Sequence, residues 1–221
     1  MTKVKDLTPN QVKISNIGSH QFTISWLTEE KTTGAIIYGE SREEVERQRG
    51  KIKVAEDQRG KDFFSRIHWV VIKNLLPEKN YYFVIKSGES VFFKKPEGSW
   101  AKEAGIADQQ KTSSEIKGEK ENSLFISGVI VDQNERPIKE ALVFLKIPGR
   151  SFPLSTLSDK DGRWFLNLVN FYFLDLTQKV SPDSKTNLFF LHIQTEEGKE
   201  RSAYFIPKLS NPLVIKIPTN E

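Results

Sequence analysis

Histidine is the side chain that most often serves as a general base near neutral pH, and this sequence contains three, His20, His68 and His192. Nucleophilic catalysis requires such a base close to a nucleophile. His68 and His192 lie in apolar runs that predict strands, whereas His20 lies in a turn before Phe22. No two of them have the spacing of a metal-binding pair. We therefore interpret all three as packed or surface histidines rather than catalytic ones.

Asp159 and Asp161 form the one tidy pair of carboxylates that could support acid–base chemistry. The string Asp-Lys-Asp-Gly also resembles part of a calcium loop, but such a loop needs a further glutamate several residues later. The residues that follow, Arg163 to Leu166, read as a strand instead. The pair therefore predicts a tight turn in which Gly162 adopts a positive φ and the aspartates accept hydrogen bonds from nearby backbone N–H groups.

Cysteine is absent, which rules out disulfides and thiolate metal sites. Glycine loops of the kind that cradle phosphate groups are absent as well. The sequence thus predicts a protein that is not an enzyme, with no catalytic residues, no bound metal and no cofactor.

Aromatic side chains are the best candidates for contacting a ligand. Phe171, Tyr172 and Phe173 are consecutive, so they cannot all face one core from an extended strand. They lie in a long insert, residues 170–187, and one hypothesis is that they form an exposed platform for a sugar. The alternative is that this insert covers the core of the second domain. Trp100 is a similar candidate, although a lone tryptophan between domains usually fills a gap on a neighbouring one.

The composition is that of ordinary globular domains, with 221 residues, 37% hydrophobic and 28% charged. The net charge of +4 is too thinly spread for a nucleic-acid-binding surface. No stretch approaches the apolar length that spans a bilayer, so we expect membrane attachment only through an anchor outside this sequence. The N-terminus shows no signal peptide. Either the protein is cytosolic, or a leader has been replaced by the initiator Met; we favour the second because of the family resemblance described below.

Short alternating runs between turn residues predict β-sandwiches. Phe22, Ile24 and Trp26 alternate strictly and should point into the first core. The strands expected in the first half are 11–17, 22–26, 33–38, 66–75, 81–86 and 90–94, with a short strand at 51–55 inside a highly charged segment, 41–61. This segment is interpreted as a solvated edge, with a basic docking loop as the alternative.

A charged stretch rich in glycine and serine, residues 97–122, predicts a linker between the two domains. The predicted domains are therefore 1–96 and 123–221. The strands expected in the second are 124–131, 138–147, 154–157, 164–169, 188–194, 201–206 and 213–217. The sequence thus predicts an all-β protein made of two antiparallel sandwiches in tandem.

The stretch from Asn74 to Tyr81 resembles the L-x-P-x-x-x-Y signature of fibronectin type III domains, and Trp26 matches their core tryptophan. The resemblance covers residues 9–96 and implies that the Tyr81 hydroxyl bonds the backbone upstream. The segments 34–39 and 68–71 resemble a subset of these domains that precedes metallophosphatase modules or occurs in exported bacterial proteins. The ligand motifs of a metallophosphatase body are not found in this sequence.

The second half resembles the carboxypeptidase regulatory-like family, which has a transthyretin-like sandwich. The family's opening pattern matches residues 126–143, and its D-x-D-G-x-F turn appears at 159–165. The resemblance covers residues 123–217, with the insert 170–187 as a departure. Together the two resemblances imply a modular bacterial surface protein.

Three functional hypotheses follow from these observations. The leading one is a non-catalytic scaffold or adhesion module at the cell surface or outside the cell, with an unidentified protein or glycan as partner. The second is a carbohydrate-binding accessory protein, which predicts that Tyr172 and Trp100 are exposed. The third is an enzyme or a non-catalytic fragment of a larger secreted hydrolase. An open edge strand in either sandwich would also permit homodimerisation, and the oligomeric state stays undetermined.

Overall fold

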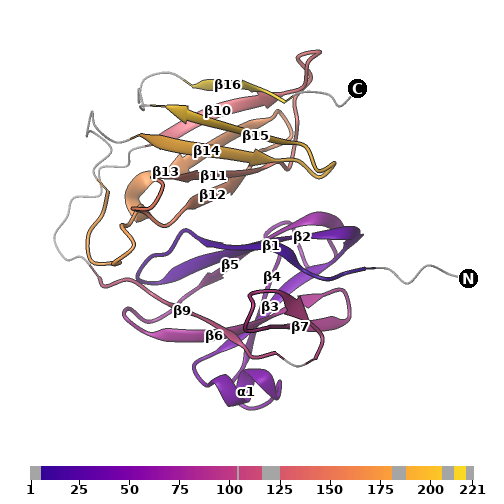
Figure 1. Ribbon diagram of the computed structural model, residues 1–221, viewed down its shortest axis with the longest axis vertical. Helices are drawn as coiled ribbons and strands as arrows, with labels where there is room; N and C mark the ends of the chain where they lie inside the picture. The colour runs from indigo at the N-terminus through magenta and orange to yellow at the C-terminus, as the bar shows by residue number, and fades with distance from the viewer. Residues whose placement is uncertain (1–5, 104, 116–124, 181–187, 206–211, 218–221) are drawn as a thin grey trace, which may run out of the picture. The chain divides into compact units, whose positions relative to one another are not determined.

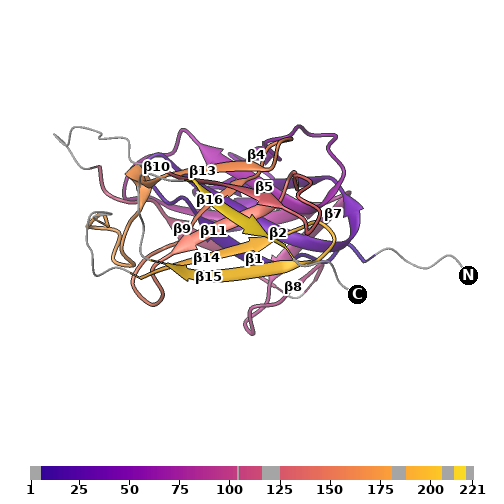
Figure 2. The same ribbon diagram turned by 90° about the horizontal axis from the view of Figure 1, so that it is seen from above.

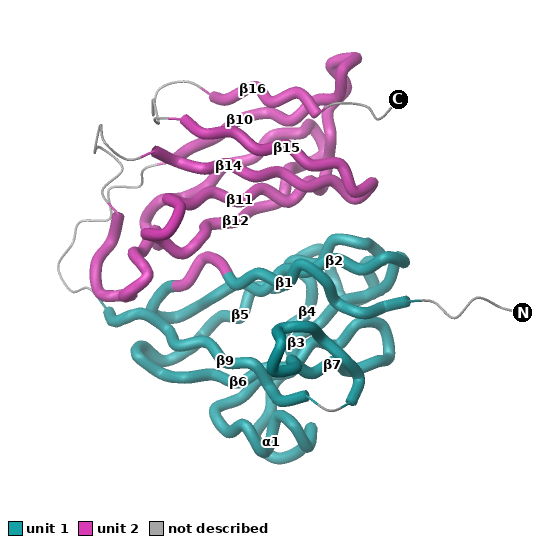
Figure 3. The backbone as a smooth tube through the Cα atoms, viewed as in Figure 1, with its two compact units in different colours: residues 1–14, 18–115 teal, residues 15–17, 116–221 magenta. Residues whose placement is uncertain are grey.

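The computed structural model describes residues 6–103, 105–115, 125–180, 188–205 and 212–217. The chain divides into two compact units, residues 1–14 with 18–115 and residues 15–17 with 116–221 (Figures 1 and 3). Both units are built almost entirely of β-strands. The predicted all-β architecture is therefore confirmed.

The first unit is a sandwich of two sheets. One sheet has the strand order β1-β2-β5, and the other has the order β4-β3-β6-β7-β8, with β9 paired to β6. Their bounds are β1 (Asn10–Ser15), β2 (Gln21–Thr32), β3 (Gly34–Gly39), β4 (Lys53–Glu56), β5 (Ser65–Lys73), β6 (Asn80–Ser87), β7 (Ser90–Lys94), β8 (Trp100–Ala101) and β9 (Asp108–Lys111).

Alternation along β2 builds the core of this sandwich. Phe22, Ile24 and Trp26 are all fully buried, as their spacing predicts. Phe83 of β6 lies across from them, with its ring 6.4 Å from that of Phe22. Burial of such large aromatic side chains supplies much of the hydrophobic stabilisation of a domain of this size.

A short helix, α1 (Arg42–Glu46), lies within the charged segment that we expected to be a solvated edge (Figure 1). Ser41 caps its N-terminus by accepting a hydrogen bond from the Glu44 backbone N–H. Val45 is buried in a small apolar cluster with Ile37 of β3 and Val84 of β6. Val45 and the partly buried Ile52 thus pack this charged segment against the sheet. In the described part of the chain, no helix has the length and apolar character needed to cross a membrane.

The first part of the expected linker belongs to the first sandwich instead. Trp100 begins β8, which pairs with β7, and β9 pairs antiparallel with β6 from Asn80 to Phe83. The linker prediction is therefore wrong for these residues, because backbone pairing and one buried tryptophan outweighed their charged, glycine-containing composition. Residues 116–122 lie outside the described residues.

The second unit is also a sandwich of two sheets, with the strand orders β13-β10-β16 and β12-β11-β14-β15. Figure 2 shows β14 and β15 side by side, as their antiparallel register requires. Most pairings are antiparallel, but β16 pairs parallel to β10. Their bounds are β10 (Phe125–Val131), β11 (Leu142–Lys146), β12 (Leu154–Leu157), β13 (Arg163–Asn167), the 3₁₀ turn η1 (Leu168–Asn170), β14 (Phe189–Gln194), β15 (Glu200–Phe205) and β16 (Leu213–Lys216).

Trp164 and Phe189 are among the largest side chains of the second core. Gly128 of β10 makes room for that tryptophan. A Cβ atom at Gly128 would lie 2.2 Å from the backbone oxygen of Leu213 and 2.8 Å from the Trp164 ring. Glycine is therefore required here by close packing rather than by backbone conformation.

Candidate functional site

The three histidines occupy structural positions. His68 stacks on Trp26 with ring centroids 4.8 Å apart, and its Nε2 lies 3.3 Å from the Thr28 hydroxyl. His192 lies 2.9 Å from the Ser202 hydroxyl through its Nδ1. His20 lies 2.9 Å from the Leu75 carbonyl oxygen. These contacts agree with packed and surface roles.

The aspartate pair forms the turn that its sequence predicts. Asp159 Oδ1 accepts hydrogen bonds from the backbone N–H groups of Asp161 and Arg163, each at 2.9 Å. Gly162 has a φ of 71°, in the left-handed region that favours glycine. The carboxylate of Asp159 thus stabilises the turn. Across the part of the chain that the structure describes, no group of three or more His, Asp or Glu side chains could hold a metal ion.

The aromatic residues predicted to contact a ligand are mostly buried. Phe171 is 0% and Tyr172 3% exposed, and Phe173 packs partly buried against the second core. Trp100 is 6% exposed and stacks on Phe83 at 6.0 Å. The predicted exposed platform is therefore wrong, because these rings fill space in the fold. Trp100 belongs to the first unit, whereas the other three belong to the second.

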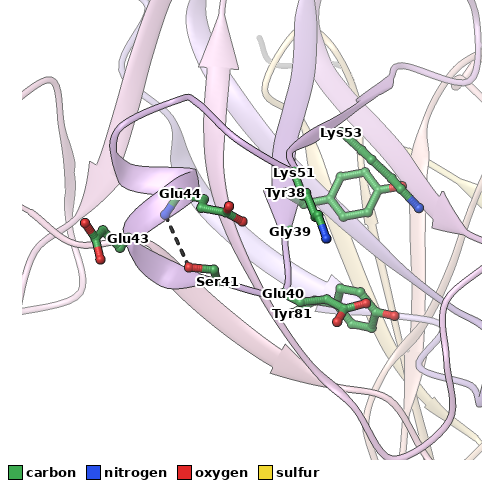
Figure 4. Close-up of a pocket in the computed structure, with 9 residues that line it drawn as sticks. All are labelled: Tyr38, Gly39, Glu40, Ser41, Glu43, Glu44, Lys51, Lys53 and Tyr81. Carbon is green, nitrogen blue, oxygen red and sulfur yellow. Dashed lines mark hydrogen bonds between the residues drawn. The ribbon is translucent and has the colours of Figure 1, made fainter.

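A cavity lies in the first unit, where β3 ends and where β4 and β6 begin (Figure 4). Its volume is 840 Å³, within the range of small-molecule sites. It is lined by strand ends, by the start of α1 and by the segment before β4, namely by Tyr38, Gly39, Glu40, Ser41, Glu43, Glu44, Lys51, Lys53 and Tyr81.

Tyr81 fixes one wall of this cavity. Its hydroxyl accepts a hydrogen bond of 2.9 Å from the backbone N–H of Leu76, five residues upstream. This is the contact that the resemblance to fibronectin type III domains implies, and it is confirmed. The ring of Tyr81 lies edge-on to the ring of Tyr38, with centroids 6.5 Å apart. The corner formed by Tyr81 thus also has a second phenol, that of Tyr38, beside it.

Tyr38 presents a phenol that keeps its proton. Burial, followed by the neighbouring Tyr81, raises the pKa of Tyr38 above its ordinary value. The side chain is 7% exposed, and no partner for its hydroxyl is found among the described residues. Tyr38 therefore offers a hydrogen-bond donor to the cavity at neutral pH.

The glutamates and the lysines that line the cavity differ in their ion-pair partners. Glu40 pairs with Lys79 and Glu43 pairs with Arg47, each at 2.9 Å. Within the described ranges, the two lining lysines, Lys51 and Lys53, have no carboxylate partner.

Sequence reasoning missed this cavity. The charged composition of residues 41–61 predicts a solvated edge. It does not indicate that Lys53 pairs directly opposite Tyr38 in the β3–β4 register. Directly opposed residues on neighbouring strands have adjacent side chains. The signal available in the sequence was a tyrosine at the end of an apolar strand, followed by a return strand that begins with lysine.

The second unit displays apolar side chains on the outer face of the sheet β13-β10-β16. Phe125 and Phe165 contact each other with centroids 6.3 Å apart, and Phe165 is 65% exposed. Val214 of β16 is exposed as well. None of these residues was singled out from the sequence, since alternation places them on the solvent side, where polar residues are usual.

Comparison with known proteins bears on the first unit. Residues 9–104 match the family described as "Purple acid Phosphatase, N-terminal domain". The first sandwich is fibronectin type III-like. The match extends beyond residue 96 and includes β8, in agreement with the place of Trp100 in the first sandwich. It covers less than half of the chain, and a search of the curated proteins finds no relative.

Solved structures show distant likenesses. The chicken CNTN1 FN1-FN3 domains share 10% identity with a TM-score of 0.32, covering 95% of this chain and 65% of that one. The segment of two fibronectin type III domains from chicken tenascin shares 14% identity with a TM-score of 0.27, covering 90% and 98%. BcpA, the major pilin subunit of Bacillus cereus, shares 11% identity with a TM-score of 0.25, covering 96% and 70%. Scores this low support no inference about function.

Proposed function

We propose that this chain is a non-catalytic scaffold or adhesion module that works at the cell surface or outside the cell. The observation that carries the proposal is the succession of two β-sandwiches, the first of which matches the N-terminal domain of an enzyme family rather than its catalytic body. A sandwich holds its loops on a rigid frame, and loops held in this way commonly carry binding contacts.

The second sandwich is proposed to be of the carboxypeptidase regulatory-like kind. Two features support this assignment. The strands β10 and β13, which carry the two matching motifs, are antiparallel neighbours in one sheet. The Asp159 turn that precedes β13 has the geometry expected of the D-x-D-G-x-F pattern.

Two measurements test the proposal. Purified full-length chain, supplied with Fe³⁺, Zn²⁺ or Mn²⁺, should not hydrolyse p-nitrophenyl phosphate faster than a heat-unfolded control. Intact cells of the source organism, treated briefly with protease, should release peptides of this chain while a cytoplasmic marker stays intact. Turnover that survives repurification would refute the non-catalytic role, and protection of the chain together with the marker would refute the location.

A non-catalytic part of a larger secreted hydrolase is the second candidate, and the family match favours it specifically because that family is an enzyme's N-terminal domain. An immunoblot of the source organism distinguishes the two candidates. A single band near 25.4 kDa is expected for the module alone, whereas a much larger band would favour the hydrolase. The carbohydrate platform at Phe171–Phe173 is not proposed, since its rings are buried or packed on the core.

A further inference from the structure

We propose that the cavity beside α1 binds a sugar acid, that is, a saccharide unit that carries a carboxylate. The carboxylate would be held by Lys51, Lys53 and the Tyr38 hydroxyl. The proposal deepens the proposed function and rests on it in one respect, namely that the ligand is bound without being converted.

The charge of the lining selects a monoanion. Glu40 and Glu43 already have cationic partners outside the cavity lining. In the described part of the chain, this leaves Lys51 and Lys53 against Glu44, which is one uncompensated positive charge. A carboxylate neutralises that charge, whereas a phosphate dianion would leave an excess of negative charge close to Glu44. Charges held near a partly enclosed surface interact more strongly than they do in water.

The Tyr38 hydroxyl is a hydrogen-bond donor in the same cavity. Tyr38 is more than nine-tenths buried, and no described residue satisfies its hydroxyl. The Tyr38 hydroxyl is not among the polar atoms that are fully shielded from solvent, so a ligand oxygen in the cavity can accept a hydrogen bond from this phenol. Lys53 lies directly opposite Tyr38 in the β3–β4 register, and Figure 4 draws both side chains at the same wall of the cavity.

The size and the acceptors of the cavity favour a sugar over a simple ion. A volume of 840 Å³ far exceeds that of a lone carboxylate or phosphate. Glu44 and Ser41 line the cavity, and Figure 4 shows the Glu44 carboxylate on the side of α1 that faces Lys51. Carboxylate and hydroxyl oxygens accept hydrogen bonds from sugar hydroxyls. Donors for a carboxylate and acceptors for hydroxyls are thus present in one cavity.

The test is a ¹H–¹⁵N NMR titration of the full chain with sodium D-glucuronate. We expect saturable shifts at residues 38–53 and at Tyr81, and weaker binding by at least about fivefold for glucose, acetate and inorganic phosphate. Glucose lacks the carboxylate, acetate lacks the hydroxyls and phosphate has the wrong charge. The free glucuronate spectrum should stay unchanged over a day, because the site does not convert its ligand.

Variants locate the site. Lys53→Gln and Tyr38→Phe should each weaken glucuronate binding by about tenfold, which corresponds to losing one charge-assisted hydrogen bond. Lys61→Gln and Tyr82→Phe are matched controls in the same unit and should bind as the parent does. Lys51→Gln serves as a second variant if Tyr38→Phe perturbs the amide spectrum as a whole.

Other results of the titration would each refute a specific part of the proposal. Absence of saturable shifts, or equal losses in the control variants, refutes the site. Equal binding of acetate or phosphate refutes the sugar, and equal binding of glucose refutes the carboxylate. Binding followed by conversion of glucuronate would uphold the site but refute the non-catalytic function. A failure of binding leaves the surface location untouched, since protease treatment of cells measures that separately.

Discussion

Removing one partner of the buried ion pair between Asp57 and Arg59 should strongly destabilise the first sandwich. The Asp57 side chain is 1% exposed and that of Arg59 13%. Asp57 Oδ1 accepts from the Arg59 backbone N–H at 3.0 Å and from its Nε at 2.9 Å. Asp57 Oδ2 accepts from Arg59 Nη2 at 2.9 Å and from the Trp69 backbone N–H at 3.0 Å. The perturbation is Asp57→Ala.

The expected loss is about 3 to 5 kcal/mol of unfolding free energy, because removing one partner of a buried, hydrogen-bonded ion pair is strongly destabilising. Arg59 keeps contacts with the Ile67 carbonyl oxygen and the Phe63 ring, whereas the Trp69 backbone N–H loses its carboxylate acceptor. A urea m-value of about 1 to 2 kcal/mol/M for a domain of this size converts the loss into a midpoint shift on the order of 2 M.

Tryptophan fluorescence during urea unfolding is the assay. Trp26, Trp69 and Trp100 lie in the first unit, so the signal reports mainly on this sandwich. Glu43→Ala is the matched control. It breaks the ion pair with Arg47 on α1, which has the same 2.9 Å separation but is exposed to solvent. Exposed pairs contribute less than about 1 kcal/mol, so the control should shift the midpoint only slightly.

The double variant Asp57→Ala with Arg59→Ala decides whether the reasoning holds. If the coupling between these two side chains causes the loss, removing Arg59 as well should cost much less than the sum of the two single changes. Strict additivity, or a loss from Asp57→Ala no larger than that from Glu43→Ala, would refute the account.

Other substitutions give smaller or more local effects. Tyr81→Phe should cost about 1 to 2 kcal/mol in urea unfolding because a backbone N–H loses its acceptor, whereas Tyr82→Phe should be nearly neutral. Gly128→Ala should destabilise the second unit by on the order of 3 kcal/mol, seen in thermal unfolding, because the new methyl group meets the backbone oxygen of Leu213; a neutral result would contradict that packing. The raised pKa of Tyr38 predicts stability that is complete below pH 10 and is lost as the pH rises through the folded-state pKa. Tyr38→Phe should abolish that part of the alkaline loss in unfolding measured against pH, and an unchanged profile would contradict it.

The sequence by itself determined the all-β architecture and nearly all of the strands. Phe22, Ile24 and Trp26 alternate with polar neighbours, and this period of two places their side chains on one face whatever surrounds them. The Asp159 turn was equally predictable, because its hydrogen bonds join atoms only two to four residues apart. Hydrogen bonds between residues this close in the chain can be predicted from the local sequence.

Tertiary structure alone decided the role of the charged segments. Residues 41–61 and 97–111 have compositions typical of solvent-exposed loops, yet Val45 anchors a helix on the sheet and Trp100 begins a strand. The cavity beside α1 depends on the same long-range pairing, since Tyr38 lies opposite Lys53 through strand register and contacts Tyr81 through packing. Composition averages over a segment, whereas strand pairing and burial depend on single residues and on partners that are distant in the chain. These side chains therefore come together through contacts between residues that are distant in the chain, and the sequence pattern alone does not predict such contacts.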